Sequence, residues 1–183
     1  MKKLNVVLGT TSFVFALFSL ILFVSCNKGK TKYNDTTLVR PCDNVICLNG
    51  GTCTDGICYC PQGFEGTQCA TRWSDKFVGN YIVDDACDTS AAGFYEAVIN
   101  PDAAYAYKLR LFQVGLFCPG KIIEAIINPE KTSFNIPSQN TCGNVYISGN
   151  GNLNGNFINI YLATRDTMLH TGNNCSLILS RKP

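Results

Sequence analysis

Short alternating runs of apolar and polar residues fill the chain from Trp73 onward, without the three-to-four-residue period of a helix. Clusters of Gly, Pro, Asn and Asp bound these runs, as at Asn100-Pro101-Asp102 and Asn128-Pro129-Glu130, and Asn154-Gly155 is typical of a two-residue hairpin. The pattern predicts an antiparallel meander of eight strands, over residues 77–84, 93–100, 105–113, 121–128, 132–136, 144–149, 156–164 and 175–181.

Eight antiparallel strands can close into an up-and-down barrel or form the two sheets of a sandwich. We favour an eight-stranded β-barrel over residues 73–183, with the β-sandwich as the alternative. Large apolar side chains are expected to fill the interior, so that binding takes place in the loops at one end or on an outer face. One candidate inward-facing set is Tyr107, Leu109, Leu111, Phe134, Ile136, Ile158, Ile160, Leu162, Leu177 and Leu179.

The stretch before the meander has a different composition, with six cysteines in the 28 residues from Cys42 to Cys69. So short a segment has too little apolar material for a core, which predicts that disulfides hold it together. Its sequence, PCDNVICLNGGTCTDGICYCPQGFEGTQC, has the cysteine spacing and the aromatic between two glycines that resemble an epidermal growth factor-like (EGF-like) module. Six cysteines allow 15 pairings; the resemblance implies the pairs Cys42–Cys53, Cys47–Cys58 and Cys60–Cys69.

Calcium-binding members of the EGF-like family carry acidic and amide residues just before the first cysteine. Here residues 37–41 supply no carboxylate, so no calcium is expected at this module. Asp55-Gly56 is interpreted as a tight hairpin turn.

The first 25 residues have the layout of a secretory signal peptide, with Lys2 and Lys3 followed by an apolar run that ends at Ser25. Phe23-Val24-Ser25-Cys26 is similar to the bacterial lipobox, although Phe23 replaces the usual Leu. The resemblance implies lipidation at Cys26 and an outer-membrane lipoprotein of a Gram-negative bacterium. The residues that follow Cys26, up to residue 41, are polar and lack hydrophobic periodicity, so residues 26–41 are expected to form a lipidated, flexible tether. The alternative is a single-pass signal anchor over Leu4–Val24.

The number of cysteines, 11, agrees with lipidation at Cys26. If Cys26 carries lipid and six cysteines form the three bridges of the module, four remain, which can form two further bridges: Cys87, Cys118, Cys142 and Cys175. In an eight-strand meander all four lie at one end of the structure, and closure brings the end of the first strand beside the start of the last. We therefore expect the bridges Cys87–Cys175 and Cys118–Cys142.

A second resemblance concerns the ends of the predicted barrel. Phe77-Val78-Gly79-Asn80-Tyr81 opens the first strand and Arg181 ends the last. This arrangement resembles a lipocalin-like, or calycin, barrel, in which a Gly-x-Trp sequence begins the first strand and a late Arg packs over that aromatic. Tyr81 replaces the Trp, and the alternative is that Gly79 only permits a bend while Tyr81 is a core residue.

Convergent titratable groups, which an enzyme needs, are few in this chain. His170 is the only histidine and lies in a polar link between strands, and the cluster Asp84, Asp85 and Asp88 is interpreted as an Asp-rich turn. Gly149-Asn150-Gly151 lacks the lysine and helix of a phosphate loop and is assigned to a strand turn. We therefore predict no catalytic residues, no metal site and no cofactor.

The charge balance of the chain argues against one class of partner. Two of the 15 basic residues lie in the signal, so the mature chain has as many basic as acidic residues. A nucleic-acid partner, which requires a concentrated basic surface, is not expected.

The sequence predicts a non-catalytic, lipid-anchored cell-envelope protein in which an EGF-like spacer precedes a barrel that binds a protein or glycan. The alternatives are a carrier of a small apolar ligand inside the barrel and, at lower weight, a hydrolase.

Overall fold

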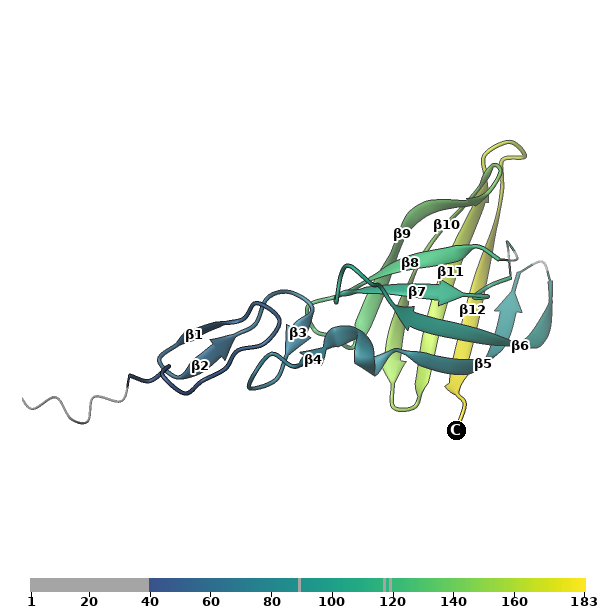
Figure 1. Cartoon of the computed structure of the whole chain (residues 1–183). Helices are drawn as coiled ribbons and strands as arrows, with labels where there is room; N and C mark the ends of the chain where they lie inside the picture. Colours follow the sequence, from purple (N-terminus) through teal and green to yellow (C-terminus); the bar gives the residue numbers. More distant parts are fainter. Residues whose placement is uncertain (1–39, 89, 117, 119) are drawn as a thin grey trace, which may run out of the picture. The chain divides into compact units, whose positions relative to one another are not determined.

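The computed structural model describes residues 40–183 except 89, 117 and 119 (Figure 1). The predicted signal peptide (residues 1–25), the lipidation site Cys26 and the tether up to residue 39 lie outside the described residues. Among the residues that are described, no helix combines the length and the apolar character needed to cross a bilayer.

Two small two-stranded sheets form the cysteine-rich segment (Figure 1). Strand β1 (Thr52–Thr54) pairs with β2 (Ile57–Tyr59) through a turn at Asp55 and Gly56, both with positive φ (50° and 82°). These angles suit a type I′ hairpin turn, as the Asp-Gly pair predicts. Strand β3 (Phe64–Glu65) pairs with β4 (Thr71–Arg72). The disulfides of the segment join Cys42–Cys53, Cys47–Cys58 and Cys60–Cys69, the pairs that the EGF-like resemblance implies.

The rest of the described chain is a closed antiparallel barrel, which confirms the predicted fold class. Its eight strands hydrogen-bond to their neighbours along the chain, and the last pairs with the first, so the sandwich alternative is wrong. They are β5 (Gly79–Cys87), β6 (Ser90–Pro101), β7 (Lys108–Phe112), β8 (Ile122–Ile127), β9 (Ser133–Cys142), β10 (Val145–Asn154), β11 (Phe157–Asp166) and β12 (Thr171–Arg181).

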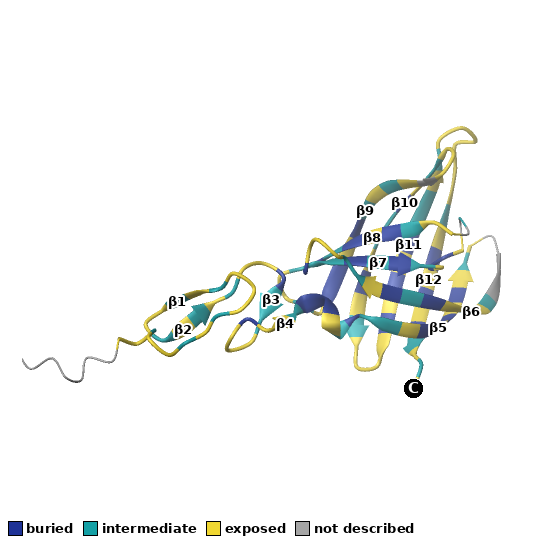
Figure 2. Ribbon diagram, viewed as in Figure 1, coloured by how far each residue is buried: buried dark blue, intermediate teal, exposed yellow. Residues whose placement is uncertain are grey.

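The barrel interior is a continuous apolar core. Buried and exposed residues alternate along the barrel strands, which Figure 2 shows as bands, and large side chains such as Phe77, Tyr81 and Phe134 are fully buried. Nine of the ten predicted inward residues are buried, whereas Tyr107 lies just before β7 and is only partly buried against the core. Eight strands leave an interior that side chains can fill or that can hold one small molecule. The continuous cluster of large buried side chains favours the packed interior that we predicted.

The ends of β9 and β10 differ most from the prediction, and β12 begins at Thr171 instead of residue 175. Strand β9 continues through Pro137 to Cys142, with irregular pairing to β10 between Ile147 and Gly149 that accommodates the proline. Strand β10 continues through Gly149-Asn150-Gly151, so the assignment of these glycines to a turn is wrong. A Cβ on Gly151 would collide with the Phe134 ring, so glycine is required here by close packing inside the barrel.

Candidate functional site

Both barrel disulfides lie where the strands β5, β9 and β12 meet one end of the barrel. Cys87 and Cys175 are directly opposed in the β5–β12 ladder, with Cα atoms 4.0 Å apart, and Cys142, the last residue of β9, bonds to Cys118. These are the two expected pairs. The Cys87–Cys175 bridge joins the first and last barrel strands, so it fastens the closure of the barrel at this end, which we call the cystine end.

The acidic residues at the cystine end point in different directions. Asp84 is exposed on the outer face, Asp85 is buried and its Oδ1 accepts a hydrogen bond from the Gly93 N–H (2.9 Å), and Asp88 accepts one from the side-chain amide of Asn174 (3.1 Å). Asp84 and Asp85 belong to β5, so the interpretation of the cluster as an Asp-rich turn is wrong for these two residues, and only Asp88 lies in a turn. Among the described residues, no group of three or more His, Cys, Asp or Glu side chains could hold a metal ion.

Tyr95 is an inward-facing polar residue that the sequence reasoning missed. The Gly115 N–H donates to its hydroxyl oxygen (2.9 Å), and the side chain is partly buried against the core. Burial raises the pKa of Tyr95, and the negative charge of nearby Asp85 adds to this effect. The hydroxyl is therefore held protonated and serves as a hydrogen-bonding group. The alternation that places Ala97 and Ile99 inward also places Tyr95 inward and could have revealed it.

His170, the only histidine, lies in the turn between β11 and β12, where it is exposed and has a φ of 52°. In the same turn the Asp166 carboxylate accepts hydrogen bonds from the backbone N–H groups of Met168 (2.8 Å) and Leu169 (3.0 Å). The apolar side chains of Met168 and Leu169 are 73% and 69% exposed. The turn thus presents apolar surface to the solvent at the cystine end.

A hollow of about 470 Å³ lies beside this turn, on strands β9 to β11. Its lining combines Tyr146, Ser148, Ala163 and Arg165, which belong to the outer surface of the barrel, with Ile147 and Thr164, which alternate with them along β10 and β11. Tyr146 is 41% exposed and is paired across the strands with Arg165. An aromatic ring, hydroxyl groups and one guanidinium therefore surround an open hollow.

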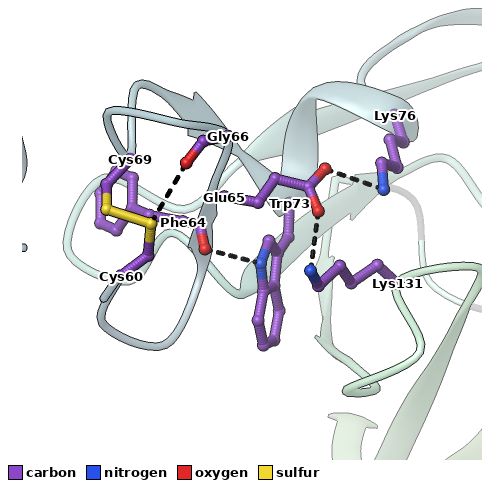
Figure 3. Close-up of polar contacts among 8 residues, drawn as sticks. All are labelled: Cys60, Phe64, Glu65, Gly66, Cys69, Trp73, Lys76 and Lys131. Atoms are coloured by element: carbon purple, nitrogen blue, oxygen red, sulfur yellow. Dashed lines mark hydrogen bonds and ion pairs between the residues drawn. A yellow bond between two sulfur atoms is a disulfide. The ribbon is translucent and has the colours of Figure 1, made fainter. Parts of the chain in front are cut away.

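The junction between the cysteine-rich segment and the barrel is held by Trp73, the first residue of a short 3₁₀-helix (Trp73–Lys76). Its indole N–H donates to the Phe64 carbonyl (3.1 Å; Figure 3). Its backbone N–H donates to the Gly63 carbonyl (2.9 Å), and its ring belongs to the barrel core. Trp73 thus contacts both sides of the junction.

Glu65 provides a second contact at the junction (Figure 3). Its carboxylate pairs with the ammonium groups of Lys131 (2.8 Å) and Lys76 (2.9 Å), and Lys131 also lies over the Trp73 ring, 5.4 Å from its centroid. Hydrogen bonds from Lys131 and Lys76 lower the pKa of Glu65. The junction is therefore a compact set of polar and ring contacts.

Arg181 lies over the Tyr81 ring at the opposite end of β12 from the disulfide. Its guanidinium is 5.6 Å from the ring centroid and donates to the Tyr81 hydroxyl (3.1 Å) and the Lys76 carbonyl (2.8 Å). The buried Tyr81 hydroxyl donates in turn to the Phe77 carbonyl (2.6 Å), and burial raises its pKa. Arg181 thereby ties the last strand to the entry of the first.

Comparisons with known proteins match parts of the chain. No family model matches it. A protein of Giardia intestinalis named "Neurogenic locus notch homolog protein" is 28% identical over 157 residues, which cover 76% of this chain and 24% of that protein. Tissue-type plasminogen activator of Sus scrofa is 42% identical over 62 residues (28% of this chain, 11% of the relative), and lactadherin of Mus musculus is 52% identical over 33 residues (15% and 7%).

The chain thus spans about a quarter or less of the length of these curated relatives. The similarities show EGF-like homology, in agreement with the three bridges between Cys42 and Cys69. Among solved structures, a redesigned β-barrel covers 62% of this chain and 98% of its own, at 15% identity and a TM-score of 0.45. A likeness at this level carries no functional argument.

Proposed function

We propose that this protein is a non-catalytic, lipid-anchored recognition protein of the cell envelope, in which the EGF-like module is a spacer and the barrel binds a protein or glycan. The observation that supports binding at the barrel surface is the hollow at the cystine end, lined by Tyr146, Arg165 and neighbouring hydroxyl groups. Binding sites commonly combine a concave surface, an aromatic ring and a few polar groups in this way.

Two further features support the assignment to recognition. Phe77, Tyr81 and Phe134 fill the barrel core, which disfavours a carrier that encloses an apolar ligand. The candidate catalytic groups do not converge, because His170 is in an exposed turn while Asp84 and Asp85 face opposite sides of β5, which disfavours a hydrolase.

We also propose that the barrel is lipocalin-like. The contact of Arg181 with the Tyr81 ring supports this assignment, since a late Arg over the first-strand aromatic is the arrangement that the resemblance implies. The outer membrane of a Gram-negative bacterium is the proposed location, with lipid at Cys26 as the membrane contact; a signal anchor is the alternative. No nucleic-acid partner is proposed.

The anchor is tested by the intact mass of the protein purified from its native membrane. The proposal predicts a new N-terminus at Cys26 carrying a diacylglyceryl group, and a Cys26→Ser variant that lacks the lipid mass. An unmodified Cys26 in the native protein, with residues 1–25 retained, would establish the signal anchor instead.

Recognition is tested with the full chain in detergent micelles, screened against panels of envelope proteins and polysaccharides. A ligand of the hollow should bind about tenfold more weakly or worse to Tyr146→Ala/Arg165→Ala. A matched control is Tyr105→Ala/Arg110→Ala, which removes an aromatic and an arginine before and within β7. Equal loss in both variants, or no ligand in either panel, would contradict the proposal.

A further inference from the structure

The outer surface of β9 to β11 carries a regular array of amide and aromatic side chains. In one cross-strand row Asn135 of β9, Asn150 of β10 and Tyr161 of β11 are paired in register. In the next row Asn152 is opposite Asn159. Phe157 lies two residues before Asn159, at the start of β11. Outward side chains recur every second residue, so successive rows are about 6.8 Å apart. We call these six residues the amide–aromatic face.

The polar groups of this face are available to a ligand. All four asparagines are exposed, and within the described part of the chain none of their side-chain amides hydrogen-bonds to another protein group. Each amide offers two donors and an acceptor. The rings are half-exposed, Phe157 at 49% and Tyr161 at 48%, and the Tyr161 hydroxyl bonds to Asn174 (2.8 Å), which fixes the position of that ring.

The face carries no formal charge. Its neighbours on β12 in the same rows, Ser176 and Ile178, are also uncharged, and the first charged side chain beyond them is Asp84 of β5. On the opposite side Ile126 separates Asn135 from Lys108. Beyond Asn152, its cross-strand partner Ser133 donates a hydrogen bond to the Glu130 carboxylate, so this charge lies at the border of the face. A polyanion needs paired cations, and a charged ligand loses hydration when it binds a surface without counter-charges. An uncharged ligand therefore suits this surface best.

Barrel closure removes one common mode of peptide binding. At this face β10 and β11 are each paired with a strand on both sides, so neither offers a free edge for an added strand. A ligand of this face has to be bound through the side-chain amides and rings. Sugar hydroxyl groups both donate and accept, and can therefore satisfy an amide in either orientation, while the C–H face of a sugar ring packs on an aromatic ring.

We propose that the amide–aromatic face binds a neutral glycan chain, which extends along β10 and β11 toward Tyr146 in the hollow. Outward residues connect the two areas without a break, because Ser148 and Ala163 lie between the Asn150–Tyr161 row and the Tyr146–Arg165 row. The inference rests on the proposed recognition function and specifies its ligand class. A second copy of this chain and a protein partner are the competing occupants.

The test measures binding of the full chain in detergent micelles to soluble β-glucan and mannan as neutral probes, with heparin and polygalacturonate as anionic probes. Wild-type protein should bind at least one neutral probe and neither anionic one. Phe157→Ala and Asn150→Ala/Asn159→Ala should weaken that binding about tenfold or more. Phe94→Ala is the matched control, because Phe94 is an exposed aromatic (78%) whose cross-strand partner is the charged Asp84, and binding should change by less than about twofold.

Thermal unfolding verifies that each variant is folded. Binding only to anionic probes, binding to no neutral probe, or equal binding by wild type and Phe157→Ala would overturn the glycan assignment. So would a dimer, detected by light scattering, that Phe157→Ala dissociates. If a protein ligand then depends on Tyr146 and Arg165, the recognition function stands without the glycan; if no ligand binds at all, both proposals fail.

Discussion

The EGF-like module and the barrel reach a defined structure by different physical means. Between Arg40 and Cys69 only Gly63 and Cys69 are buried, and three disulfides join the loops. In the barrel a continuous set of apolar side chains is buried, and the two disulfides lie at one end. Small domains bury too little surface to fold without covalent links, whereas a chain of about 110 residues can rely on its core. The module should therefore depend on its bridges and the barrel on its packing.

Removing a bridge from the module should have the largest structural effect, because it should unfold the module as a whole. The Cys47–Cys58 bridge closes a separation of 11 residues, and its loss in Cys47→Ser/Cys58→Ser removes about 3 kcal/mol, which is most of what stabilises so small a domain. Backbone amides of β1 and β2 should lose protection in hydrogen exchange, while those of β11 keep it.

The barrel variant Cys87→Ser/Cys175→Ser provides the matched comparison. Its thermal midpoint should fall, but β5 and β12 should remain protected because seven register pairs from Arg181↔Tyr81 to Cys175↔Cys87 join them. Protected β1 and β2 amides in the module variant, or an unfolded barrel in this one, would contradict the division between the two regions.

Truncation of the barrel core comes next. Phe134 packs edge-on against Phe77, with ring centroids 5.5 Å apart, and occupies the space above Gly151. Phe134→Ala should lower the free energy of unfolding of the barrel by about 3 to 5 kcal/mol, because a fully buried ring leaves a cavity. Urea denaturation followed by Trp73 fluorescence measures this change.

The exposed ring of Phe94 is the control for that experiment. Phe94→Ala should change the free energy of unfolding by less than about 0.5 kcal/mol. Similar values for the two variants would mean that the barrel, like the module, does not rely on a packed interior.

A smaller effect is expected at Arg181, which connects the two ends of the barrel sheet. Arg181→Ala removes the hydrogen bonds to the Tyr81 hydroxyl and the Lys76 carbonyl and should cost about 1 to 2 kcal/mol in the same denaturation experiment. Arg181→Lys keeps the charge but lacks the planar guanidinium, so its free energy of unfolding should lie between those of wild type and Arg181→Ala. A variant as stable as wild type would show that the contact over Tyr81 is not stabilising.

The smallest effect concerns Glu65, where the two regions meet. Its pKa is lowered in the folded protein, so its stabilising contribution is fully present above the ordinary Glu value of 4.5 and is lost as the pH falls through the lowered pKa. Glu65→Gln should cost less than about 1 kcal/mol at neutral pH, because the ion pairs are partly exposed.

Hydrogen exchange of the Trp73 indole N–H, which donates to the Phe64 carbonyl, reports on this junction. Protection should fall in acid for wild type but vary less with pH in Glu65→Gln. The control Glu96→Gln removes the ion pair with Lys182, away from the junction, and its Trp73 indole protection should vary with pH as in wild type. Identical acid profiles for all three proteins would exclude Glu65 as the titrating group.

Much of the fold could be predicted because it depends on local signals. Alternation and turn residues predicted eight barrel strands, and the closed meander placed Cys87 beside Cys175. The course of β9 through Pro137 and of β10 through Gly149 and Gly151 could not be predicted. Both depend on packing between strands: the irregular pairing tolerates the proline, and Phe134 requires the glycine.

The candidate binding surface was predicted only in general terms, as the cystine end or an outer face. The two-residue loop between β10 and β11 is Gly155-Asn156, one residue later than the predicted Asn154-Gly155. The predicted loop would have paired Asn150 with Asn159, so the pairing of Asn150 with Tyr161 could not be derived from the sequence. The position of Asn135 could not be derived either, because irregularities in the β9–β10 pairing shift its register. The hollow around Tyr146 likewise requires three-dimensional packing.

The central claim is that the barrel surface carries recognition and the module serves as a spacer. The most direct measurement compares the affinity of the full chain for its best neutral polysaccharide in two variants. Cys47→Ser/Cys58→Ser, which disrupts the module, should bind within about twofold of wild type, whereas Asn150→Ala/Asn159→Ala on the intact barrel should bind about tenfold more weakly or worse. The reverse result, with binding lost in the module variant and kept in the barrel variant, would contradict the account.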